Sequence, residues 1–137
     1  MNKLLHKEVS EKILKAYYNV YNSLGYGFLE RVYQNSMYYE LIDLGLDVVA
    51  QKQIKVYYKG KIVGEYFADL IVENKIIVEL KATSVLIQSH STQLYNYLKA
   101  TNIEVGLLLN FGEEAEFERI IITNDKKKNL NNQYNLK

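Results

Sequence analysis

Two apolar segments that carry charges in their interior constrain the fold of this chain most. Residues 66–72 and 76–81 are rich in strand-forming residues, and only Glu73-Asn74-Lys75 separates them. So short a connection is typical of an antiparallel hairpin. Because both segments are apolar on both faces, they are predicted to be central strands covered on each side.

Asp69, Glu79 and Lys81 lie inside these predicted strands. An isolated buried charge is costly unless it is paired, hydrogen-bonded or bound to metal. Glu79 and Lys81 share a face because side chains alternate along a strand. A three-residue loop sets Val72 against Ile76 and brings Asp69 opposite Glu79, whereas a two-residue loop turns Asp69 away. The chain is therefore predicted to have an odd-length loop here, or a bulge with the same effect.

The composition excludes several kinds of site. The chain has 137 residues, no cysteine and two histidines, so a bound metal would have oxygen ligands. The formal net charge of +1 gives no global attraction to nucleic acid or to membranes. A phosphate-binding surface must therefore be a local concentration of lysine and arginine. No apolar run approaches the roughly 18 residues of a membrane span, no signal peptide is recognisable, and we expect a cytoplasmic protein without membrane contact.

Hydrophobic periodicity extends the prediction to the whole chain. The order α-α-β-β-β-α-β-β predicts an α/β fold with a mixed central sheet between helices. Residues 1–123 are expected to form a single domain, and the Asn- and Lys-rich residues 124–137 a frayed tail. Helices are predicted at 7–24, 29–44 and from 86 or 89 to 100, and strands at 48–58, 63–72, 76–81, 105–109 and 118–123.

The charged trio has two readings when it is judged from the residues alone. Two carboxylates can hold Mg²⁺ or Mn²⁺ and leave positions for water and phosphate oxygens. A neighbouring lysine can then orient the water or neutralise developing charge. The E-x-K spacing also occurs in the polar loop Glu73-Asn74-Lys75, so spacing by itself is weak evidence. A structural salt bridge and a functional site remain equally supported.

Several ordered motifs add a resemblance to a known family. Asp69 followed by Glu79-x-Lys81 on consecutive strands resembles the PD-(D/E)XK nuclease superfamily, with its restriction-endonuclease-like fold, although Ala68 stands where the name-giving proline would be. The segment Gly27–Tyr33 is similar to the motif that names the GxxExxY protein family. The resemblance runs from about residue 8 to 122 and includes residues 66–70, 78–82, 93–99 and 110–112.

The resemblance implies a Mg²⁺- or Mn²⁺-dependent nuclease that hydrolyses a DNA or RNA backbone with metal-activated water. Asp69, Glu79 and Lys81 are then the catalytic residues. Asp69, Glu79 and the backbone carbonyl of Leu80 are expected to hold the metal, with Lys81 assisting the nucleophile. Glu30 is implied as a further ligand, either directly or through water. Without the family, Glu30 is better read as an exposed glutamate in the first turn of a helix.

The third predicted helix contributes further candidates. Gln93 and Tyr97 resemble a Q-x-x-x-Y element of exonuclease-like members, which implies that they position the nucleic-acid strand. His90 lies on the same face one turn earlier and is expected to support the site, as is Tyr33 on the second helix. Without the resemblance, Gln93 would be a surface amide and His90 a surface or capping histidine.

A second hypothesis is a non-catalytic binding or interaction module that keeps the nuclease fold, with or without a bound metal. Such a module could be a homodimer, because aromatic residues are favoured in interface cores. About half of the candidate tyrosines are expected to pack in the core instead. The candidates are Tyr17, Tyr18, Tyr21, Tyr38 and Tyr39.

Overall fold

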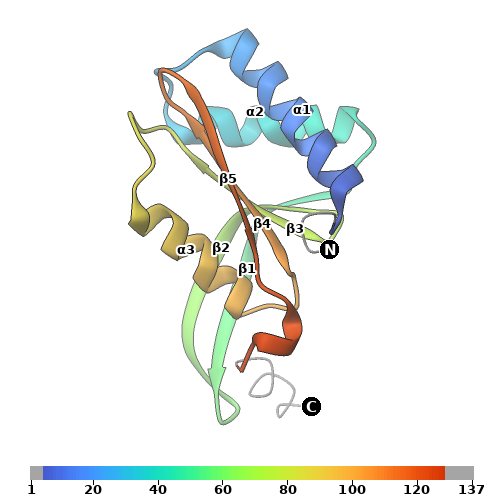
Figure 1. Cartoon of the computed structure of the whole chain (residues 1–137), viewed down its shortest axis with the longest axis vertical. Coiled ribbons are helices and arrows are strands. Elements are labelled where there is room, and N and C mark those ends of the chain that lie inside the picture. The colour runs from blue at the N-terminus through green and yellow to red at the C-terminus, as the bar shows by residue number, and fades with distance from the viewer. Residues whose placement is uncertain (1–4, 129–137) are drawn as a thin grey trace.

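The computed structural model describes residues 5–128, in which helices cover both faces of a sheet (Figure 1). The elements follow the predicted order, and their ends differ from the predicted ones by about three residues at most. They are α1 (Lys7–Leu24), α2 (Glu30–Asp43), β1 (Val48–Tyr58), β2 (Lys61–Val72), β3 (Ile76–Lys81), α3 (Gln88–Lys99), β4 (Val105–Phe111), β5 (Ala115–Ile121) and the 3₁₀-helix η2 (Asn124–Lys126).

The sheet has the strand order β1-β2-β3-β4-β5. Strands β3 and β4 run parallel and are joined through α3, while the other neighbours are antiparallel. The pairing of β2 with β3 begins with Val72 opposite Ile76. The predicted three-residue loop is therefore confirmed, and with it the odd parity that orients Asp69.

The two faces of the sheet are covered by different helices. Helices α1 and α2 pack together on one face, and α3 packs on the other (Figure 1). Alternate residues of β3 serve the two sides: Val78 joins the cluster under α1 and α2, and Ile77 joins the cluster under α3. This arrangement confirms the predicted α/β fold with a mixed sheet between helices.

The sequence sets the length of the first two helices. The buried residues Ile13, Ala16, Tyr17 and Val20 recur at helical spacing along α1. Glycines with positive φ then end both helices: φ is 66° at Gly25 after α1 and 84° at Gly45 after α2. L-residues rarely adopt these angles, so glycine is the natural residue at both ends.

The five tyrosines considered for an interface divide between core and surface. Tyr17 is fully buried, and its hydroxyl donates to the Asn110 carbonyl and accepts a hydrogen bond from the Glu116 N–H (2.9 Å). Tyr21 and Tyr38 are partly buried against the same core. Tyr18 and Tyr39 are exposed, by 40% and 67%. Only this last pair is available to a partner.

The prediction that both central strands are covered on each face is wrong for the outer half of β2. Residues 61–67 are mostly exposed, and Val63 reaches 62%. The reason is that β3 pairs only with Leu70–Val72, so β1 is the only strand paired with the outer half of β2. Together these outer halves form a hairpin that projects from the sheet (Figure 1).

The beginning of the predicted tail packs on the rest of the fold. Residues 124–126 form η2, and the side chain of Lys127 is buried. Residues 129–137 of that tail lie outside the described part of the chain. Within residues 5–128, no helix has the length and apolar character needed to cross a membrane.

Candidate active site

Asp69 and Glu79 meet where β2 and β3 diverge. Backbone pairing of these strands ends with Leu70 opposite Val78. At the next position the Asp69 N–H donates to Oε1 of Glu79 (3.2 Å), and the Leu80 N–H donates to Oδ2 of Asp69 (2.9 Å). Each carboxylate thus accepts a backbone N–H that a backbone carbonyl would accept in a regular β-sheet. The two side chains lie together, as the odd loop predicts.

The strand geometry breaks at this point. Ala68 packs in the cluster under α3, whereas Leu70 packs in the cluster under α1 and α2, so the alternation of β2 reverses across Asp69. Gln51 lies opposite Asp69 on β1, between the pairs Ala50–Leu70 and Lys52–Ala68, and has a positive φ of 52°. Such a conformation is uncommon for a non-glycine residue and is often found at functional sites.

Gln51 itself is a residue of the site that the sequence did not predict. Its Nε2 donates to Oε1 of Gln34 on α2 (2.8 Å) and lies 3.5 Å from Oδ1 of Asp69. Gln34 could be found from its helical spacing to Glu30. Gln51 could not be found by counting back from the hairpin turn, because the register shifts between Val56 and Tyr57.

Glu79 is a buried carboxylate, with 3% of its surface exposed. Burial is the largest cause that raises its pKa above the usual range of a glutamate, and the neighbouring Asp69 carboxylate raises it further. The Lys81 ammonium acts in the opposite direction with a smaller effect. In the absence of another cation, Glu79 therefore retains a proton at neutral pH.

Lys81 is held beside this pair by α3. Its Nζ donates to Oε1 of Gln93 (3.1 Å), and Gln93 also forms a side-chain hydrogen bond with Tyr97. Burial raises the pKa of Tyr97 to about 12, and the carboxylates of Glu79 and Asp69 contribute to the shift. The Tyr97 hydroxyl therefore keeps its proton and can donate a hydrogen bond. These three residues lie together as predicted.

Glu30 and Tyr33 occupy different positions from the carboxylate pair. Glu30 is the exposed first residue of α2, and no group of three or more acidic, histidine or cysteine side chains suited to a metal occurs among residues 5–128. Tyr33 is buried and stacks on Phe111, with 4.1 Å between ring centroids. Its hydroxyl donates to the Gly25 carbonyl (2.8 Å) and accepts from the Phe28 N–H (3.2 Å). Tyr33 therefore fixes the loop from which α2 and Glu30 begin.

His90 stabilises the start of α3. Its Nδ1 accepts a hydrogen bond from the Ile87 N–H (3.2 Å), which has no acceptor within the helix. The ring thus orients the first turn of α3, one turn before Gln93. The structure gives His90 a contact with the helix end and none with the carboxylates.

The donor groups at the divergence fit a hard divalent cation. Asp69 and Glu79 supply carboxylate oxygens, the ligand type that Mg²⁺ prefers. The N–H and C=O of one strand residue point to the same side. Because the Leu80 N–H faces Asp69, the Leu80 carbonyl also faces the gap that β2 leaves. A cation there would offset the negative charge that makes ionised Glu79 unfavourable.

A comparison with known proteins identifies the superfamily of this chain. A family model described as the PD-(D/E)XK nuclease superfamily matches residues 7–120. The chain belongs to this superfamily. No curated protein and no solved structure matches it significantly. PD-(D/E)XK nucleases generally use divalent metals such as Mg²⁺, and membership suggests a nucleic-acid substrate. The narrower GxxExxY assignment remains a prediction from the motif at residues 27–33.

Replacing Glu79 with glutamine should stabilise the metal-free protein at neutral and alkaline pH. The raised pKa means that folded Glu79 binds a proton which the unfolded chain releases above the ordinary glutamate pKa. The free energy of unfolding therefore falls as pH rises through that window. Glu79→Gln removes this loss, and we expect a gain of about 1–3 kcal/mol near pH 8 and little change near pH 4.

Urea denaturation in chelator at both pH values measures this difference. Glu114→Gln, in the exposed turn between β4 and β5, is the matched control and should leave the pH dependence unchanged. A Glu79→Gln protein that is less stable than wild type at both pH values would contradict the burial argument.

Proposed function

We propose that the protein is a metal-dependent nuclease that hydrolyses phosphodiester bonds of a nucleic-acid backbone. The observation that supports this most is the position of two carboxylates at the end of the β2–β3 pairing. Glu79 accepts the Asp69 N–H, Asp69 accepts the Leu80 N–H, and Lys81 follows on the same strand. Two fixed carboxylates next to a lysine have the groups that metal-assisted hydrolysis requires. Superfamily membership favours a catalytic site over a structural salt bridge at these residues.

Asp69, Glu79 and the Leu80 carbonyl are the proposed ligands of Mg²⁺ or Mn²⁺. When bound, such an ion would polarise the phosphodiester and lower the pKa of the attacking water. Glu30 is proposed to act through water, because it is exposed and not grouped with the other two carboxylates. Gln51 and Gln34 can orient Asp69 from the side of β1 and α2.

Lys81 is proposed to assist the nucleophile. Its ammonium can orient the water or neutralise charge that develops on the phosphate oxygens. Gln93 restricts the ammonium to this position through the 3.1 Å hydrogen bond. Gln93 and the protonated Tyr97 hydroxyl can also donate to the backbone of a bound strand. His90 supports these residues through the start of α3.

The wider proposal is a single nuclease domain of the GxxExxY type over residues 1–123, acting in the cytoplasm on DNA or RNA. The absence of cysteine fits a reducing compartment. The structure describes this domain from Leu5 onward.

A non-catalytic module is the second candidate. The separation of Glu30 from the carboxylate pair favours it, because fewer protein ligands then hold a metal. The exposed rings of Tyr18 and Tyr39 offer a surface for a homodimer of such a module. In that case a metal would stabilise the fold and no strand would be cut.

Lys81→Ala separates the two candidates. Purified protein is incubated with single- and double-stranded DNA and RNA in Mg²⁺, Mn²⁺ or chelator. For a nuclease we expect chelator-sensitive cleavage that Lys81→Ala lowers by roughly 100- to 1,000-fold, since a charge stabiliser of the transition state is lost. Isothermal titration should still show metal binding.

Lys75→Ala is the matched control, because Lys75 belongs to the other E-x-K sequence and is exposed. It should retain wild-type cleavage. Metal binding without cleavage of any of the four substrates would exclude the nuclease and support the module.

A further inference from the structure

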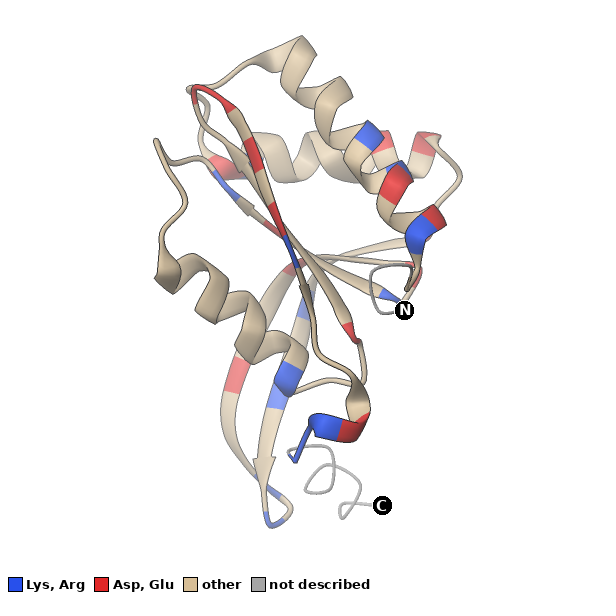
Figure 2. Cartoon of the chain, in the orientation of Figure 1, with Lys and Arg blue, Asp and Glu red and all other residues tan. Residues whose placement is uncertain are grey.

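Charge is distributed unevenly over a chain whose net charge is only +1. Figure 2 shows acidic segments along the β4–β5 hairpin, and basic segments at the opposite end of the molecule. The acidic residues are Glu113, Glu114, Glu116 and Glu118, and most of their side chains are exposed. The basic end combines the C-terminal end of α3, η2 and the tip of the β1–β2 hairpin. The local concentration of lysine that a phosphate-binding surface needs is therefore present there.

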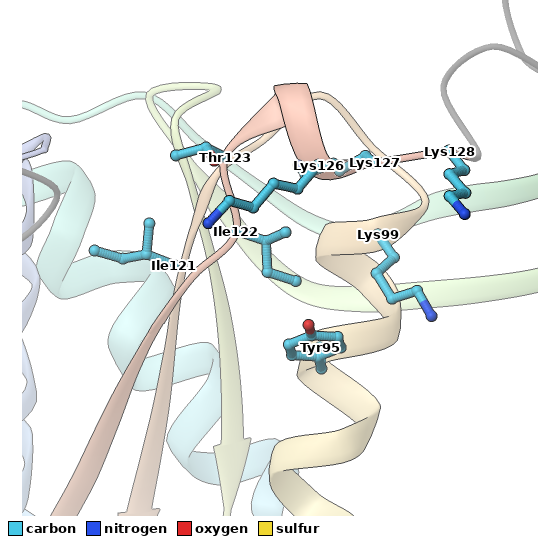
Figure 3. Close-up of a pocket in the computed structure, with 8 residues that line it drawn as sticks. All are labelled: Tyr95, Lys99, Ile121, Ile122, Thr123, Lys126, Lys127 and Lys128. Atoms are coloured by element: carbon cyan, nitrogen blue, oxygen red, sulfur yellow. The ribbon is translucent and has the colours of Figure 1, made fainter.

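A cavity at this basic end contains four lysines. Its volume is about 430 Å³, and its lining includes Tyr95 and Lys99 of α3 together with Lys126, Lys127 and Lys128 (Figure 3). No aspartate or glutamate lines it. We call these five residues the lysine pocket. Tyr95 and Lys99 lie on the other side of α3 from Gln93 and Tyr97, so the pocket is separate from the candidate active site.

Lys127 makes the pocket more than a cluster of surface charges. Its side chain is 7% exposed, and its Nζ donates to the carbonyls of Ile103 (2.6 Å) and Thr101 (3.0 Å). An ammonium has three N–H groups, so one can still donate to a ligand. Burial lowers the pKa of Lys127 to about 8, although Glu104 acts in the opposite direction. The hydrogen bonds of this buried cation go to neutral carbonyls, and an anion in the pocket would stabilise it further.

A second cavity continues the basic surface on the other side of the Thr101–Ile103 loop. It has a volume of about 530 Å³ and is lined by Lys52 and Lys55 of β1, again without any carboxylate. Lys52 follows Gln51, which contacts Asp69. The cationic surface thus extends from the lysine pocket toward the strands that carry the candidate active site.

We propose that the lysine pocket binds a phosphate group of a nucleic-acid strand and serves as a second anchoring point apart from the catalytic centre. Phosphate is favoured because several lysines can donate to its oxygens at once, and compact ammonium groups bind it as point charges. The assignment to a nucleic-acid strand rests on the proposed function, whereas the affinity for phosphate rests on the pocket alone.

The distance along α3 suits this assignment. Gln93 and Lys99 are six residues apart, or about 9 Å along the helix axis. A strand advances about 3.4 Å per nucleotide, so roughly three steps cover that rise, and a few more allow for passage around the end of the helix.

The test measures binding without cleavage. A fluorescent oligonucleotide of about 12 nucleotides is titrated in chelator against Asp69→Asn protein, followed by anisotropy at several salt concentrations. Into this background we place Lys99→Gln, Lys126→Gln and Lys128→Gln together, which leaves the buried Lys127 in place. The matched control replaces Lys7, Lys12 and Lys15 of α1 with glutamine, which removes the same charge from the opposite face of the sheet.

We expect the pocket variant to bind the oligonucleotide at least about tenfold more weakly and to reduce the slope of log K against log salt by about 2. The α1 variant should change both much less. Equal weakening by the two variants would overturn the proposal. In a parallel experiment, inorganic phosphate is titrated while amide NMR signals of α3 and η2 are followed. Phosphate shifts without an effect of the pocket variant on the oligonucleotide would assign the pocket to free phosphate and overturn the nucleic-acid assignment.

The two proposals fail in different ways. If cleavage is absent but the pocket variant weakens oligonucleotide binding, the nuclease proposal fails and the anchoring site stands. If cleavage depends on Asp69 but both triple variants bind the oligonucleotide alike, the nuclease proposal stands and the anchoring site fails.

Discussion

Asp69→Asn is expected to lower the rate of nucleic-acid cleavage by at least about 1,000-fold, which corresponds to about 4 kcal/mol of transition-state stabilisation. Asparagine keeps the size of the side chain, and its Oδ1 can still accept the Leu80 N–H. The negative charge that would bind the metal is lost. Single-turnover cleavage at saturating metal measures the effect, and isothermal titration should show weaker Mg²⁺ binding.

The fold should survive this change. Glu79 is already protonated in the metal-free protein, and the change to asparagine removes the remaining buried charge of the pair, so the melting temperature in chelator should be unchanged or higher. Asp43→Asn, at the exposed end of α2, is the matched control and should cleave like wild type. Cleavage by Asp69→Asn within tenfold of wild type would show that the reaction takes place elsewhere on the protein.

Asn110→Asp is expected to destabilise the protein by roughly 3–5 kcal/mol, because it buries a carboxylate and sets one of its oxygens against a carbonyl oxygen. Asn110 is fully buried on β4, opposite Lys81 of β3. Its Nδ2 donates to the Thr83 carbonyl (2.9 Å), and its Oδ1 accepts from the Thr83 N–H (3.0 Å). Aspartate replaces that donor with an oxygen that faces the Thr83 carbonyl. The segment that follows Lys81 then loses one of these two hydrogen bonds to β4.

The pH dependence of the stability of Asn110→Asp identifies the cause of its destabilisation. When the introduced carboxyl group is protonated, it could donate to Thr83 again, so the deficit should shrink near pH 4 and grow toward pH 7. Urea denaturation at both pH values tests this. Asn35→Asp, exposed on α2, is the control and should change stability by less than about 0.5 kcal/mol. A deficit that does not depend on pH would indicate a packing defect in place of a buried charge.

The order of elements and the orientation of Asp69 could be predicted because both depend on local information. Helical periodicity and terminal glycines set α1 and α2, and the length of the loop at residues 73–75 fixed which side chains oppose one another. Such features need no knowledge of distant packing.

Features that depend on distant contacts could not be predicted. The apolar pattern of β2 is the same whether or not β3 pairs with its outer half, so the exposure of residues 61–67 has no local signal. Tyr33 and His90 have the spacing of site residues, yet they bond to the backbone of Gly25, Phe28 and Ile87. Composition predicted fraying from residue 124 onward, but two carbonyls bind the ammonium of Lys127.

The break in β2 at Asp69 also has a mechanical consequence. The projecting hairpin joins the rest of the sheet next to Asp69, because β3 pairs with the inner half of β2 only, and the outer half meets α3 through Tyr66 and Tyr97. A change in the angle between the hairpin and the sheet would first strain the two hydrogen bonds at the junction. These are the bonds from the Asp69 N–H to Glu79 and from the Leu80 N–H to Asp69. The backbone ladders of the core are not disturbed. A load on the hairpin is therefore transmitted directly to the pair of carboxylates.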